Sequence, residues 1–205
     1  MLLLCGCAHS AAAPAPVPPS RTAPTSTTST TATASSALDD LLLSDIQGDH
    51  AFPWSLDRRL VWSDFQGKPP SEGREGAKTT YALYSAWKCR GDAFQFRVVA
   101  GFRTAQSWVK PAVLQDSVQS RTILAHEQVH FDLAEVHARL MRRYFAGLTG
   151  ACRKSDAQLT ALAQRLEDEA GAEQRRYDTE TDHGLVADRQ AQWSIQTRRR
   201  LATSQ

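Results

Sequence analysis

The sequence has no long hydrophobic run and no stripe of basic residues. After the first few residues, no segment approaches the ~20 apolar residues that a membrane-spanning helix needs, so we expect none. The net charge is only +2, with acidic and basic residues interspersed, and no basic patch is interleaved with aromatic residues. This pattern argues against a nucleic-acid-binding surface.

The first quarter of the chain has no aromatic residue. Residues 11 to 37 are almost entirely Ala, Pro, Ser and Thr, and such a stretch cannot bury enough apolar surface to offset the entropy of ordering it. All five Trp, seven Phe and four Tyr lie further along the chain. We therefore predict a disordered tether and pre-domain segment over residues 8–50 and one catalytic domain over residues 51–205.

Cysteines are few, and their positions suggest two uses. Leu2-Leu3-Leu4-Cys5-Gly6-Cys7 resembles the end of a bacterial lipoprotein signal with Cys7 as the lipid acceptor, although the charged n-region and most of the apolar run are lacking. A lipid at Cys7, followed by the tether of residues 8–50, would be the protein's sole contact with a membrane. In an exported domain the remaining pair, Cys89 and Cys152, is expected to form a disulfide.

Strand-like patterns precede helical ones, which predicts an α+β domain. Residues 60–70 suggest a strand running into a turn, and residues 78–89 and 93–102 suggest two strands of a hairpin, the second with alternating apolar positions. Helical periodicity begins near Pro111 and continues in segments from Ser155 to about Tyr177 and from Leu185 to about Leu201. Ser155 is a candidate N-cap.

The most informative feature is the segment His126-Glu127-Gln128-Val129-His130. Residues four apart lie on one face of a helix, so His126 and His130 can bind one zinc ion. Glu127 borders such a metal without binding it, and can serve as general base and then general acid.

A catalytic zinc usually has a third protein ligand. His137 is a poor candidate, because it lies about 10 Å beyond His130 along the helix axis. Acidic and histidine side chains further along the chain remain open: Glu167, Glu169, Glu173, Glu180, Asp182 and His183. Of these we favour His183, because the adjacent Gly184 gives the backbone freedom to direct its ring; the alternative is a helix-capping role.

Three blocks together resemble a bacterial domain family of unknown function described as predicted secreted zinc-dependent proteases. The blocks are Leu60-x-Trp62-x-Asp64-Phe65-x-Gly67-x-Pro69, His126-Glu127-Gln128-x-His130-Phe131-Asp132-x-Ala134-Glu135 and Tyr177-Asp178-x-x-Thr181-x-His183-Gly184. The likeness covers roughly residues 56–193. It implies export, a zincin-like fold and zinc-assisted peptide hydrolysis, and it adds support for His183 as a ligand.

We therefore expect an exported or lipid-anchored zinc metallopeptidase of the bacterial periplasm, outer membrane or cell surface, acting on a peptide or protein. Tyr177 is a candidate to stabilise the oxyanion, although packing is its plainer role, and Asp132 and Glu135 are candidates to orient the imidazoles. Three alternatives stay open: a zinc hydrolase of cell-wall peptides, an envelope lipoprotein with structural zinc, and a scaffolding lipoprotein without metal.

Overall fold

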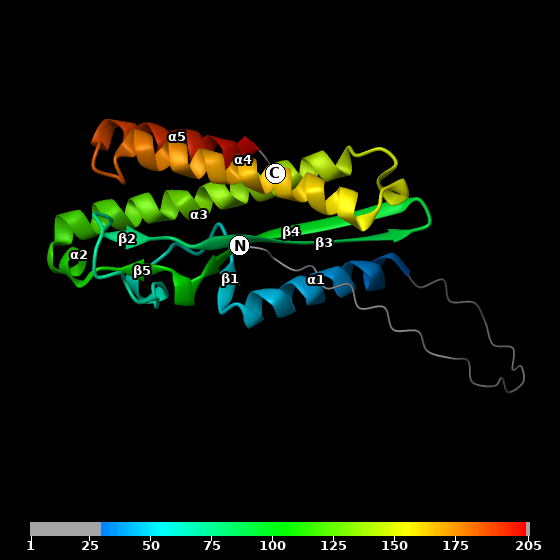
Figure 1. Ribbon diagram of the computed structural model, residues 1–205, viewed down its shortest axis with the longest axis horizontal. Helices are drawn as coiled ribbons and strands as arrows, with labels where there is room; N and C mark the ends of the chain where they lie inside the picture. The colour runs from blue at the N-terminus through cyan, green and yellow to red at the C-terminus, as the bar shows by residue number, and fades with distance from the viewer. Residues whose placement is uncertain (1–29, 204–205) are drawn as a thin grey trace, which may run out of the picture.

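A long helix, α3 (Ser117–Ala146), lies at the centre of the protein, with a β-sheet on one side and two helices on the other (Figure 1). The computed structural model describes residues 30–203; the proposed lipid acceptor Cys7 lies outside them. No helix in that range is long and apolar enough to cross a membrane. The described chain is a mixed α+β structure, as the order of patterns predicted.

The main sheet is antiparallel, with strand order β1-β4-β3. Its strands are β1 (Ala51–Pro53), β3 (Tyr81–Arg90) and β4 (Ala93–Arg103), and β3 and β4 form the predicted hairpin. Gly91 has φ +58° in the two-residue turn, a conformation that favours glycine. A second, two-stranded sheet pairs β2 (Ala77–Lys78) with β5 (Trp108–Val109).

The sheet packs on α3 through alternate residues of β4, as the sequence pattern predicted. Phe96, Val98 and Phe102 lie in the main core with Phe131 and Phe145 of α3. Apolar side chains therefore pin the sheet to the helix that carries both histidines of the motif.

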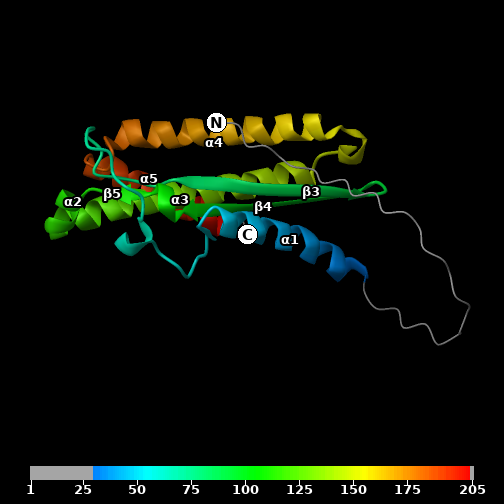
Figure 2. The same cartoon turned by 60° about the horizontal axis from the view of Figure 1, so that its bottom comes forward.

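The helix α1 (Thr30–Gly48) covers the opposite face of the sheet (Figure 2). Leu38, Leu42 and Ile46 recur every four residues and are buried against Tyr84 and Ala86 of β3. The predicted boundary near residue 51 was therefore too late. The spacing of these three apolar residues places them on one helix face, which binds the segment to the sheet.

Three elements complete the layer around α3. The short α2 (Pro111–Gln115) precedes it, and α4 (Asp156–Thr181) and α5 (Ala187–Thr203) pack on its far side. Ser155 is the N-cap of α4, as predicted, and forms a capping box with Gln158. A disulfide joins Cys89 at the end of β3 to Cys152 in the 3-10 turn Ala151–Arg153 just before α4, the pairing expected from the sequence.

The segment predicted as a strand from Leu60 is instead irregular, with a 3-10 turn at Trp62–Asp64. Another 3-10 turn, Thr104–Gln106, connects β4 to β5. The Asp64 carboxylate accepts a hydrogen bond from the Val61 N–H, 2.9 Å away, and pairs with Arg58 at 2.7 Å. These local bonds stabilise a turn. The β-branched and aromatic residues of the segment, taken alone, had suggested a strand.

Candidate metal centre

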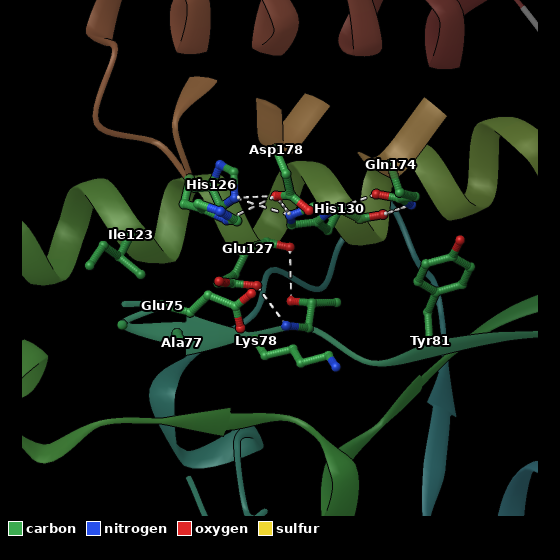
Figure 3. Close-up of a pocket in the computed structure, with 13 residues that line it drawn as sticks. Glu75, Ala77, Lys78, Tyr81, Ile123, His126, Glu127, His130, Gln174 and Asp178 are labelled. Atoms are coloured by element: carbon green, nitrogen blue, oxygen red, sulfur yellow. Dashed lines mark hydrogen bonds and ion pairs between the residues drawn. The ribbon is translucent and has the colours of Figure 1, made fainter. Parts of the chain in front are cut away.

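Three electron-donating atoms meet where α3 crosses α4. Asp178 Oδ1 lies 3.1 Å from His126 Nε2 and 2.8 Å from His130 Nε2. The two Nε2 atoms are 3.0 Å apart. Figure 3 shows His126, His130 and Asp178 pointing toward one another across the two helices. His126 and His130 are the two histidines predicted as metal ligands. Asp178 was not among the residues considered for the third ligand.

Two glutamines hold the far side of the imidazole rings. The Gln174 side-chain amide donates to His130 O at 2.9 Å, so its Oε1, 2.6 Å from His130 Nδ1, accepts a hydrogen bond from that nitrogen. Gln190 Oε1 lies 3.1 Å from His126 Nδ1. A proton on each Nδ1 leaves the neutral ring's lone pair on Nε2.

The lone pairs of two Nε2 atoms and a carboxylate oxygen repel one another unless a cation lies among them. Without metal, a proton on His130 supplies the positive charge that relieves this repulsion. Burial alone would lower the pKa of His130, but the hydrogen bond with Asp178 and the charges of Glu127 and Asp178 outweigh burial and raise it. Burial would likewise raise the pKa of Asp178, yet the hydrogen bonds and charges of both histidines hold it well below its usual value.

The donor set also fits a divalent metal. Two donors bound tetrahedrally to one zinc at about 2.0–2.1 Å lie about 3.3 Å apart, close to the three distances found here. Two imidazoles and one carboxylate are a ligand set that zinc accepts. The residues present therefore fit the ion that the motif suggested.

His183 lies at the rim of this cluster and not within it. Its Nδ1 is 3.6 Å from Asp178 Oδ1, and its side chain is 47% exposed. The potential ligand atoms of His126, Asp178 and His183 lie within 4.8 Å of one another. Asp178 therefore supplies the third atom of the cluster, and His183 lies at its rim.

The turn after α4 brings His183 to this rim by a tight chain reversal. Asp182 and His183 have φ of +45° and +54°, and Gly184 has φ of +87°. A Cβ atom on Gly184 would lie 2.9 Å from His126 Cβ, which is closer than real contacts allow. Glycine is therefore required where the chain passes the first imidazole.

Glu127 lines the same pocket, a hollow of about 140 Å³ that His126, His130, Asp178 and His183 also line (Figure 3). Its Oε2 accepts a hydrogen bond from the Thr79 N–H at 2.7 Å, just after β2. No other described residue donates a hydrogen bond to this carboxylate. The residue proposed as general base is therefore fixed beside the cluster and makes no bond to the three donors.

Tyr177 does not line the pocket. It is fully buried, its ring stacks on His126 with centroids 4.6 Å apart, and its hydroxyl donates to Gln190 Oε1 at 2.7 Å. Burial raises the pKa of this phenol. Tyr177 therefore supports His126 and Gln190 and does not reach the position of an oxyanion in the pocket.

Asp132 and Glu135 make no bond to either imidazole in the described chain. Asp132 accepts hydrogen bonds from Trp54 Nε1 at 2.9 Å and from Gln128 at 2.8 Å. Glu135 pairs with Arg139 at 2.7 Å and with Arg142. Their positions on α3, two and five residues after His130, turn both carboxylates away from the cluster.

The other acidic candidates for a ligand have partners elsewhere or face away. Glu173 pairs with His137 at 2.7 Å and with Arg200 at 2.8 Å, which also explains why His137 is buried and not a ligand. Glu180 accepts from Trp193 Nε1 at 2.9 Å. Asp182 caps α4 through its backbone N–H and is exposed. Glu167 and Glu169 lie further back along α4.

Helical spacing was the signal that could have found the missing residues. Gln174 and Asp178 are four apart on α4, just as His126 and His130 are on α3, so each pair forms one short row facing the other. Asp178 also stands inside the third of the sequence blocks quoted above.

Comparison with known proteins gives one match. No curated protein and no solved structure is significantly similar to the chain. A family model matches residues 66–184, more than half of the 205 residues, and this stretch contains His126, Glu127, His130, Asp178 and His183. The chain therefore belongs to the family described as "Bacterial protein of unknown function (DUF922)".

Proposed function

We propose that this chain is an exported, zinc-dependent hydrolase of peptide bonds with a zincin-like catalytic site. The observation that carries the proposal is the meeting of His126 Nε2, His130 Nε2 and Asp178 Oδ1 within about 3 Å of one another. Here three donors converge, and two glutamines hold both rings in the tautomer that suits a metal.

A zinc ion held by these three residues would polarise a peptide carbonyl and make water a better nucleophile near neutral pH. Glu127 supplies the proton transfers. Thr79 N–H fixes one carboxylate oxygen, so the other is oriented to take a proton from the attacking water and to deliver it to the leaving amine. Gln174 and Gln190 keep the two rings from rotating.

Export is part of the proposal and has independent support in the disulfide. Cys89 and Cys152 are bonded to each other, and such bonds persist mainly in oxidising compartments. Lipid anchoring at Cys7 remains a proposal from the sequence.

The decisive experiment compares Glu127→Gln with the unaltered full-length protein. The amide keeps an acceptor for Thr79 N–H but cannot accept the proton, so hydrolysis of casein should fall by about 100-fold or more. Zinc content, measured by elemental analysis of protein purified without chelators, should be unchanged. Glu72→Gln, an exposed carboxylate outside the pocket, is the matched control.

Full activity of Glu127→Gln would refute the role of this residue, and absence of any divalent metal from the purified protein would refute the zinc proposal. Purified peptidoglycan tested beside casein distinguishes a hydrolase of cell-wall peptides from one of proteins.

A second candidate is a structural zinc site, and the position of His183 favours it. With Nδ1 3.6 Å from Asp178 Oδ1, a small movement of this exposed ring would add a fourth protein donor. Four protein ligands are typical of structural zinc, whereas catalytic zinc keeps one position open. His183→Ala should leave hydrolysis intact in the catalytic case and should abolish tight zinc binding in the structural one.

A further inference from the structure

A groove runs along the free edge of β3, between this strand and α4, which lies lengthwise beside it (Figure 2). Two adjoining hollows of about 150 and 310 Å³ form the groove, and both are lined by Ala82, Leu83, Gln164 and Glu167. Tyr81 lines both the larger hollow and the pocket of the candidate metal centre. The groove and the pocket of that centre therefore border each other at Tyr81.

The edge of β3 presents a row of backbone groups to this groove. Thr80 O accepts a hydrogen bond from the N–H of Arg103 on β4, 2.8 Å away. In an antiparallel pair, consecutive residues alternate between bonding the partner strand and facing away from it. The N–H and C=O groups of Tyr81, Leu83 and Ser85 therefore face outward, and no further strand of the described chain pairs with them. An edge of this kind can accept an added strand.

Glu167 projects into the middle of the groove with no hydrogen bond or ion pair to any described residue. It is half-buried, and burial, together with the charge of Asp168, raises its pKa to about 7. Asp45 and Asp168 also line the groove. The basic residue Arg103, which lines the larger hollow, is paired with Asp49 at 3.1 Å. Asp45, Glu167 and Asp168 thus give the groove three acidic groups, and Glu167 has no partner among the described residues.

We propose that the groove binds the substrate as an extended peptide that adds a strand to β3 and places a lysine or arginine side chain against Glu167. This inference rests on the proposed hydrolase function, since it treats the groove as the substrate's path into the site. A basic side chain would supply the partner that Glu167 lacks, and the outward backbone groups of β3 would bind any sequence.

The position of the basic residue follows from the geometry for a substrate strand that is antiparallel to β3, the orientation we propose. Glu167 and Asp178 are 178 − 167 = 11 residues apart on α4, which is about 16 Å along the helix. An extended peptide covers this distance in about five residues. Because β3 runs away from the site, a strand added antiparallel to it runs toward the site. The basic residue then lies about five positions before the scissile bond.

The first test maps the bonds that the full-length protein cleaves in a mixture of peptides from a denatured proteome. We expect Lys and Arg to be enriched about five residues before the cleaved bond. The enrichment should disappear with Glu167→Gln and persist with Glu169→Gln, which removes a neighbouring exposed charge of α4. Cleavage without this enrichment, or enrichment that survives Glu167→Gln, would overturn the inference while leaving the hydrolase proposal standing.

The second test needs no activity. Fluorescence anisotropy would measure binding of a labelled peptide of about ten residues, long enough at about 3.3 Å per residue to fill the groove, to the Glu127→Gln variant. Replacing its lysine by glutamine should weaken binding about tenfold, and Glu167→Gln should remove that difference. Methylating one backbone nitrogen of the peptide at a time should weaken binding at every second residue and leave it unchanged at the residues between. Equal binding of both peptides would overturn the inference. Lysine-dependent binding by a protein that hydrolyses nothing would instead refute the proposed function alone.

Discussion

Replacing Asp178 tests the identity of the third metal ligand directly. In Asp178→Ala the oxygen that lies 2.8 and 3.1 Å from the two Nε2 atoms is lost, while both histidines stay attached to their glutamines. Loss of an outer-shell partner of a metal ligand costs about 10–100-fold in affinity, so loss of a direct ligand should cost more. We expect zinc affinity to fall by about 1,000-fold, equivalent to about 4 kcal/mol.

The assay is competition for zinc against a chromophoric chelator, run on the unaltered protein, Asp178→Ala and His183→Ala. His183→Ala should weaken zinc binding less than about tenfold, because this side chain is 47% exposed and lies outside the triad. Asp182→Asn is the control, since it removes an exposed carboxylate nearby and Asn tolerates its left-handed backbone. The assignment is wrong if Asp178→Ala keeps its zinc while His183→Ala loses it.

Three further changes probe the supports of the site. Gly184→Ala should lower both the melting temperature and zinc affinity, because the added Cβ strains a backbone with φ +87° and meets His126. Gly171→Ala within α4 should instead stabilise by about 0.5–1 kcal/mol, because its Cβ meets only the flexible end of the Arg175 side chain, at 3.3 Å. Tyr177→Phe should weaken zinc binding by about tenfold or less and spare kcat, whereas a kcat loss of about 100-fold or more at unchanged zinc content would restore the oxyanion role. In Glu173, burial would raise the pKa, but hydrogen bonds from His137 and Arg200 outweigh it and lower it to about 2. Its stabilisation is therefore present above the unfolded pKa near 4.5 and is lost as the pH falls toward 2; urea unfolding should show Glu173→Gln less stable by about 1–2 kcal/mol at pH 7, with the gap closing below pH 4.5.

Local signals predicted those parts of the fold that are formed by local interactions. The N-cap Ser155, the hairpin with Gly91 at its turn and the helix around His126 all depend on residues close in the chain. The strand predicted from Leu60 was wrong because one carboxylate, Asp64, closes a turn there.

The third donor could not be chosen from the sequence for a different reason. The chain has 22 acidic residues, and what singles out Asp178 is the crossing of α4 over α3, which aligns two i,i+4 rows. The same crossing turns Glu173 toward His137 and Arg200 and leaves Glu180 with Trp193. Spacing along one helix identifies which residues share a face, but only the packing of two helices decides which face meets the histidines.

The two ends of α4 are held in place by different interactions. The groove lies between these two points of attachment. At its start, the Cys89–Cys152 disulfide and the bond from Trp87 Nε1 to Asp156, 3.3 Å long, hold the helix to the far end of β3. At its other end, Asp178 holds it to the histidines of α3. Between these points the side chains of α4 and β3 leave the hollows around Glu167. A metal ion bound by Asp178 would strengthen the tie at one end, and reduction of the disulfide would remove one of the two ties at the other.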